Sequence, residues 1–151
     1  MTSVNVVFIV LNSAIKTRIV CELAEKCYLN QQRIVVFARD DEECKKIDAL
    51  LWTWKQQSFV PHIYIPVLAD PQFEPVVLTS KIDADTGYDT LLMLDPLPIE
   101  QIKYFQQVID FAEKYDSHSI EQSRDRYKLY RDQQYHIETM QPGEFLHSVP
   151  Q

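Results

Sequence analysis

Lys16, Thr17 and Asp95 are the residues whose types and spacing could serve nucleotide chemistry. A Lys followed by Ser or Thr ends a phosphate-binding loop, and an Asp that closes a buried strand can hold the accompanying Mg²⁺. The turn before Lys16 reads LNSA and contains no glycine, so its backbone cannot approach a phosphate closely. Asp95-Pro96 also fits a plain strand end. A degenerate nucleotide-binding enzyme that uses these three residues is therefore the alternative hypothesis.

The other reactive side chains match no catalytic or metal-binding motif. The four histidines are scattered, and none stands near a Cys or a carboxylate at a zinc spacing. On a helix, Cys44 lies one turn from Asp40, Asp41 and Asp48, which disfavour its thiolate. The acidic run Asp40–Glu43 suits the start of a helix better than a divalent-ion site. The sequence therefore predicts no catalytic residue, no bound metal and no cofactor.

Ser123–Arg131 (SRDRYKLYR) carries side chains suited to binding another protein. On a helix, Arg124, Tyr127, Lys128 and Arg131 fall at i, i+3, i+4 and i+7, which places one ring and three cations on a single face. This basic segment stands out in a chain of net charge −7. Two interpretations stay open, a solvated helix face or a dock for an acidic peptide with Tyr127 as an apolar wall.

Leu50–Pro66 is a second candidate surface because aromatic and apolar residues are dense there. Trp52 stands near the end of a predicted helix, and Phe59, Val60 and Pro61 begin an extended stretch. Rings at such a junction are typical of interface anchors, but the same density also occurs in cores. Both interpretations stay open at this stage.

The elements that must position these residues follow from hydrophobic periodicity. Val4–Leu11 and Arg33–Ala38 are apolar and β-branched, as strands buried on both faces are. Ala14–Gln31 reads as a helix whose apolar stripe comprises Val20, Leu23, Ala24 and Cys27. Asp40 can cap the next helix. The order β-α-β-α predicts a parallel sheet with helices on its faces.

The rest of the chain divides into shorter elements, because prolines at 61, 66, 71 and 75 exclude long helices between them. Gln107–Ala112 fits a helix or a strand, and periodicity does not decide. The other expectations are strands over His62–Pro66, Pro75–Ser80 and Thr90–Asp95, an exposed loop over Lys81–Asp89, a helix over Ile99–Phe105, a helix over Ser119–Gln134 capped by Ser119, and an edge strand over Tyr135–Glu138. Residues 1–140 form one domain in this interpretation, and Gln141–Gln151 a loose tail.

Composition narrows the functional classes. The net charge of −7 argues against direct, strong binding to nucleic acid, which relies on basic surfaces that neutralise phosphates. No apolar run is long enough to cross a bilayer, and the first residues lack the basic start of a signal peptide. Cys21, Cys27 and Cys44 show no CxxC spacing, so free thiols in a reducing cytoplasm are expected.

Several stretches resemble the chi subunit of bacterial DNA polymerase III, a clamp-loader accessory protein. They are IVCELAEKCY in the first helix, RIVVFARDDEECKKIDALLW, SFVPH, and RDRYKLYR followed by an aromatic residue at Tyr135. They occur in the family's order over most of the chain, and the combination of SFVPH with RYKxYR is more specific than either alone. The resemblance implies a three-layer α/β/α fold with a mostly parallel sheet, like a nucleotide-binding fold without its phosphate-binding loop. It also favours a strand over Gln107–Ala112.

The resemblance further implies a non-catalytic replication adaptor. Chi proteins pair with the psi subunit, which tethers them to the clamp loader, and they bind the acidic, Phe-terminated C-terminal tail of single-stranded DNA-binding protein. DNA would then be reached only indirectly. By position, the tail-binding residues fall on Arg124, Tyr127, Lys128 and Arg131, and the psi-binding region falls around Trp52, Phe59, Val60 and Pro61.

The sequence departs from the family pattern near the tail-binding residues. A basic residue that the family can carry one turn before Arg124 is here Ile120 or Glu121, and Ala112 replaces a larger apolar residue. The loop Lys81–Asp89 is acidic rather than basic. These departures would weaken or reshape tail binding.

Overall fold

The computed structural model describes residues 3–14 and 16–148, in which seven strands form one sheet in the order β3-β4-β2-β5-β6-β1-β7. Every paired strand runs parallel to its neighbour. The strands are β1 (Asn5–Leu11), β2 (Ile34–Phe37), β3 (His62–Tyr64), β4 (Val76–Thr79), β5 (Thr90–Met93), β6 (Gln107–Glu113) and β7 (His136–Met140). The described part of the sheet is thus wholly parallel, where the sequence predicted a mostly parallel one.

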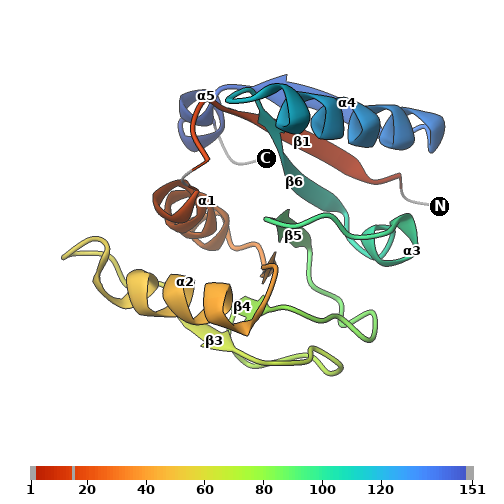
Figure 1. Ribbon diagram of the computed structural model, residues 1–151. Helices are drawn as coiled ribbons and strands as arrows, with labels where there is room; N and C mark the ends of the chain where they lie inside the picture. Colours follow the sequence, from red (N-terminus) through yellow and green to blue (C-terminus); the bar gives the residue numbers. More distant parts are fainter. Residues whose placement is uncertain (1–2, 15, 149–151) are drawn as a thin grey trace.

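Helices cover both faces of this sheet (Figure 1). They are α1 (Thr17–Leu29), α2 (Asp41–Thr53), α3 (Ile99–Ile102), α4 (Ser117–Asp132) and α5 (Pro142–Leu146). The buried side chains of α1, α2 and α5 pack into one core cluster, and those of α3 and α4 pack into another. This confirms the predicted three-layer α/β/α architecture.

Alternation along β1 shows how the sheet serves both cores. Val7, Ile9 and Leu11 point to the side of α1, whereas Val6 and Phe8 point to the side of α4. A strand buried on both faces needs apolar residues at every position, which explains the unbroken apolar run in the sequence. The predicted stripe on α1 is also confirmed, because all four of its residues are buried against the sheet.

The structure decides two segments that the sequence assigned differently or left open. Within Lys81–Asp89, predicted as an exposed loop, Ile82 and Tyr88 are buried. Gln107–Ala112, for which two assignments stayed open, lies in β6 between β5 and β1. Its pairing on both sides makes it a strand, a property that depends on distant segments and not on its own periodicity.

The chain after β7 also differs from its prediction as a loose tail. α5 has a complete capping box, in which Gln141 and Glu144 bond each other's backbone N–H groups. Phe145 is buried in the core cluster on the side of α1. Residues 141–148 are therefore part of the domain, because one aromatic anchor and a capped turn tie them to it. Residues 149–151 lie outside the described part of the chain.

Candidate partner-binding surfaces

α4 is the element that carries the predicted basic face, and it starts two residues before its predicted beginning. Asp116, rather than Ser119, caps the helix, since its Oδ1 accepts a hydrogen bond from the Ser119 N–H at 2.7 Å. That bond lowers the pKa of the Asp116 carboxyl. Ser119 lies inside the first turn and is buried. An Asp in this position satisfies free N–H groups at the helix start as a Ser would.

A buried polar network fixes the rotation of α4 on the sheet. Asp110 of β6 accepts hydrogen bonds from Arg126 Nε at 2.9 Å and from the Tyr130 hydroxyl at 2.8 Å. Burial raises the pKa of Asp110, and these donors favour its ionised form against that cost. Burial also opposes the charge of Arg126, but Asp110 outweighs it and raises the pKa of the guanidinium. Arg126 is thus an internal cation and does not belong to the basic surface.

The opposite side of α4 faces solvent. Arg124, Lys128 and Arg131 are exposed, and Tyr127 keeps 43% of its surface accessible. Neither Arg124 nor Lys128 forms an ion pair with any residue that the structure describes, and Arg131 meets only the adjacent Asp132, at 3.8 Å. The four residues share one face, as the helical spacing predicts, and their charges remain available to a ligand.

An apolar hollow of about 450 Å³ opens beside this face, between α4 and the sheet. Phe8 of β1 lines it from the sheet, and its ring centroid lies 6.0 Å from that of Tyr127. The register places Phe8 of β1 between Asp110 of β6 and Thr139 of β7. The hollow is lined by Phe8, Ala112, Glu113, Lys114, Ile120, Ser123, Arg124, Tyr127 and Thr139.

Most of these lining residues could not be assigned to the site from the residues alone. Phe8, Lys114 and Thr139 come from three different parts of the chain, and only strand pairing brings them under α4. Ala112 was noted only as a departure from the family pattern, and its small side chain leaves the space for the hollow. Alternation assigns Phe8 and Ala112 each to one face of its own strand, but the pairing that brings these two faces together is not written in the local pattern.

The second predicted surface lies at the junction between α2 and β3. Trp52 and Phe59 are 55% and 64% exposed, and their ring centroids are 6.0 Å apart. Trp52 also packs on His62, at 4.4 Å between centroids, and His62 is held against the carbonyl oxygen of Val60. Two large, solvent-exposed rings therefore lie side by side, and the contacts of His62 with Trp52 and with the Val60 carbonyl support them.

Val60 and Pro61, the other two residues predicted for this surface, are placed differently. Val60 is 1% exposed and belongs to the core cluster, so it cannot contact a partner directly. Pro61 is half-buried. Because Val60 anchors the chain beneath Phe59, its contribution is to hold the exposed ring in position.

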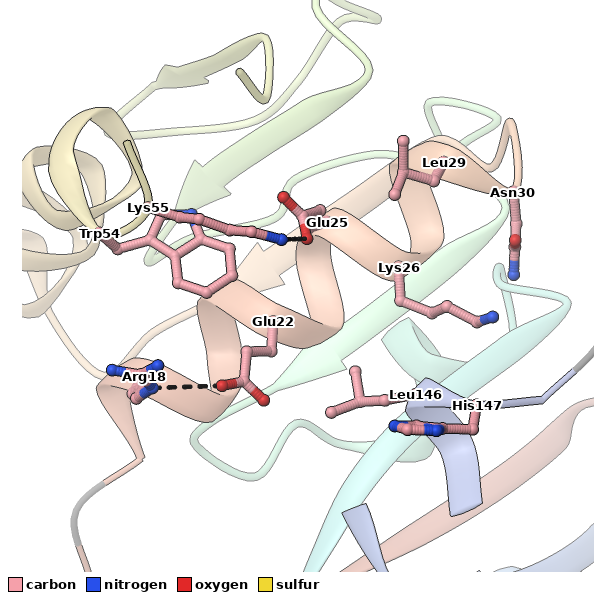
Figure 2. Close-up of a pocket in the computed structure, with 10 residues that line it drawn as sticks. All are labelled: Arg18, Glu22, Glu25, Lys26, Leu29, Asn30, Trp54, Lys55, Leu146 and His147. Carbon is pink, nitrogen blue, oxygen red and sulfur yellow. Dashed lines mark hydrogen bonds and ion pairs between the residues drawn. The ribbon is translucent and has the colours of Figure 1, made fainter. Parts of the chain in front are cut away.

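Polar contacts to α1 hold the loop between Trp52 and Phe59. Glu25 accepts hydrogen bonds from Lys55 Nζ at 3.3 Å and from the Ser58 hydroxyl. Figure 2 shows Lys55 reaching from the end of α2 to Glu25, above a groove whose other side is formed by Leu146 and His147. Arg18 and Glu22 on α1 also pair with each other, so these charged side chains of the groove are matched within the protein.

Comparison with known proteins assigns the chain to a family. The family model described as DNA polymerase III chi subunit, HolC, matches residues 1–138. This chain belongs to the DNA polymerase III chi subunit family. It is 25% identical over 122 residues to DNA polymerase III subunit chi of Escherichia coli (strain K12), covering 81% of this chain and 82% of the relative. The protein of the same name from Pseudomonas aeruginosa is 27% identical over 125 residues, covering 82% and 84%.

The chi-family chain retains a crevice where nucleotide-binding folds place their ligand, at the carboxyl ends of the strands. Lys16, Thr17 and Asp95 line it, but Lys16 is paired with Glu113. The other cations that line it are Arg39, paired with Asp40, and Arg126, paired with Asp110. Burial, followed by the charge of Glu43, raises the pKa of Asp95. These pairings leave no lining cation among the described residues unmatched for a phosphate.

The thiols of this chi-family chain are unsuited to nucleophilic chemistry. Cys21, Cys27 and Cys44 are buried, and burial raises the pKa of each to about 12. For Cys44, the carboxylates of Asp41, Glu43 and Asp40 add to the shift. Over residues 3–14 and 16–148, no three His, Cys, Asp or Glu side chains gather as a metal site requires. In the same residues, no helix has the length and apolarity to span a bilayer.

Proposed function

We propose that this replication accessory subunit is a non-catalytic adaptor with two docking surfaces. The α4 surface, defined as Arg124, Tyr127, Lys128, Arg131 and the hollow beside them, binds the acidic, Phe-terminated C-terminal tail of single-stranded DNA-binding protein. The aromatic pair Trp52 and Phe59 binds the psi subunit. The observation that carries the proposal is the apolar hollow rimmed by unpaired cations on a chain of net charge −7.

The chemistry of the α4 surface fits such a tail in two parts. The hollow accepts the terminal Phe ring against Tyr127 and Phe8, and burying a ring contributes about 1.5–3 kcal/mol. Arg124, Lys128 and Arg131 follow the helix away from the hollow and can meet successive carboxylates. Each exposed pair contributes about 0.2–1 kcal/mol, so ring and charges together are needed for micromolar affinity, about −8 kcal/mol.

The exposure of the aromatic pair and the contacts that hold it in place support its assignment to psi binding. Two neighbouring large rings in solvent form the kind of anchor that a partner buries at the centre of an interface. The contacts from Glu25 and His62 hold the pair in place before binding. A preformed anchor loses little conformational entropy when the partner covers it.

Titration of a fluorescently labelled tail peptide tests the α4 surface. Arg124→Ala should weaken binding about fivefold, because it removes one cation at the mouth of the hollow. Ala112→Phe should weaken it more, about tenfold or beyond, because the new ring fills the space meant for the ligand's ring. Lys46→Ala on the exposed side of α2 is the matched control and should bind as wild type does. Equal affinities for all four proteins would refute tail binding at this surface.

A further inference from the structure

A patch at the amino ends of β2 and β4 carries both a projecting ring and a hollow. Phe73, three residues before β4, is 94% exposed, more than any other large apolar residue that the structure describes. A hollow of about 310 Å³ opens nearby, between the end of α1 and the start of β4. Single exposed apolar side chains are common on proteins, so the hollow close to the ring is the informative feature. The hollow is lined by Tyr28, Leu29, Gln31, Gln32, Arg33 and Pro75.

Hydrogen bonds hold the backbone on both sides of Phe73. The hydroxyl of Tyr88 donates to the Glu74 carbonyl oxygen at 3.1 Å and accepts from the Gln72 N–H at 3.2 Å. The Arg33 guanidinium donates to the Gln72 carbonyl oxygen and stacks on the Tyr88 ring, 4.6 Å from its centroid. Because Tyr88 is itself buried, the exposed ring is carried by a fixed backbone.

The walls of the hollow are fixed as well. The Ile34 N–H donates to the Pro75 carbonyl oxygen at 2.8 Å, which ties the β4 wall to β2. On the α1 wall, the Gln31 N–H donates to the Tyr28 carbonyl oxygen at 2.9 Å, in the turn that ends the helix. Leu29, the last residue of α1, keeps 67% of its surface accessible. A partner would therefore bury preformed apolar surface here, with little loss of conformational entropy.

The patch also carries one unmatched charge of each sign. Arg33 forms no ion pair with the residues that the structure describes, since the Asp89 carboxylate bonded to it accepts from its backbone N–H. Glu74, next to the projecting ring, has no ion pair within the described part of the chain. A ring beside a carboxylate thus complements a hollow beside a guanidinium. Both halves of this complement lie on one patch of one chain.

We infer that this patch, the Phe73 patch, joins two copies of this chain around a twofold axis. The patch comprises Leu29, Arg33, Phe73, Glu74 and Pro75. Each ring enters the hollow of the other copy, which brings each Glu74 beside the other copy's Arg33. A second copy is the occupant because a twofold contact needs one surface that complements itself, and this patch does.

The inferred contact goes beyond the proposed adaptor function. It centres on one ring from each copy, so we expect a weak, transient dimer of the kind that small interfaces form. The Phe73 patch shares no residue with the α4 surface or with the aromatic pair. A dimer would therefore present two copies of each docking surface, and a partner with several acidic tails would bind it with increased avidity.

Analytical ultracentrifugation of the full chain measures this association. For wild type, the weight-average mass should rise from that of a monomer toward that of a dimer between about 10 µM and about 1 mM. Phe73→Ala should weaken the dimer about a hundredfold, because two rings lose their burial. Leu129→Ala removes an exposed apolar side chain from α4 and is the matched control, which should associate as wild type does. Melting curves of each variant verify that it is folded.

A mixing experiment tests the exchange of ring and hollow directly. Leu29→Arg adds a second cation to the wall beside Arg33, so it should also weaken self-association about a hundredfold. A mixture of the Phe73→Ala and Leu29→Arg proteins retains one intact contact, between the ring of the second and the hollow of the first. The mixture should associate at least about tenfold more tightly than either variant alone.

The outcomes separate this inference from the proposed function. A wild type that stays monomeric over the whole range would overturn the dimer and leave the adaptor function standing. Self-association that Phe73→Ala leaves unchanged, or a mixture no tighter than its components, would place the contact elsewhere on the chain and refute the inference. If Phe73→Ala weakens psi binding and wild type does not self-associate, the patch extends the psi surface and the inference is wrong.

Discussion

The two proposed docking surfaces are built on different physical foundations. The α4 surface combines cations with a shallow apolar hollow, and a buried ionic network holds its helix against the sheet. The Trp52–Phe59 surface is apolar, and aromatic stacking with a few polar contacts to α1 supports it. One surface should therefore respond to salt and to loss of its internal network. The other should respond mainly to removal of a ring.

Breaking the Asp110 network should have the largest effect. Asp110→Ala leaves Arg126 with an unpaired charge in a mostly buried position, so the unfolding free energy should fall by about 3–5 kcal/mol. Chemical denaturation measures this loss. Tail affinity should fall in the fraction that stays folded, because α4 is released, whereas psi binding should persist.

Two further variants separate the network from a general effect on α4. Asp125→Ala removes an exposed carboxylate from the same helix and should change stability by less than about 0.5 kcal/mol. Asp110→Ala combined with Arg126→Met removes both charges and should recover part of the stability. An Asp110→Ala protein with unchanged stability and tail affinity would contradict the role given to the network.

Removing one ring from the aromatic pair should have the next largest effect. Phe59→Ala should weaken psi binding about thirtyfold, which corresponds to about 2 kcal/mol for one buried ring. Stability should change little because Phe59 is 64% exposed. Val60→Ala offers the contrast, since it removes buried methyl groups and should lower stability by about 1–3 kcal/mol. Co-purification of psi that is undiminished by Phe59→Ala would count against this surface.

Salt should change affinity least among these tests, but it should distinguish the two surfaces most clearly. Raising ionic strength from about 0.1 M to 1 M shortens the screening length from about 10 Å to 3 Å. Tail affinity should fall several-fold because exposed cations contribute to it, and psi affinity should stay nearly constant. Isothermal titration of both partners across a salt series measures the difference. Parallel slopes for the two partners would remove the distinction drawn between the surfaces.

Sequence patterns predicted much of the fold and the helix residues of the α4 surface, but not the hollow beside them. The unbroken apolar run of β1 predicted a strand buried on both faces, and the spacing of Arg124, Tyr127, Lys128 and Arg131 predicted one helix face. Such features are local, because they depend on the period of a single element. The missing glycines before Lys16 likewise argued against a phosphate loop without any knowledge of the fold.

Only the tertiary structure decided which residues complete each surface. Strand order brings Phe8, Ala112 and Thr139 together beside Tyr127. The hydrophobic pattern of a single strand does not reveal which distant strand it pairs with. Burial removed Val60 from its predicted place in the second surface, because its side chain lies in the core cluster. Arg126, on the same helix as the α4 surface, is held inside by its ion pair with Asp110. The sequence by itself determined which faces exist, and packing determined which of their side chains remain free to bind.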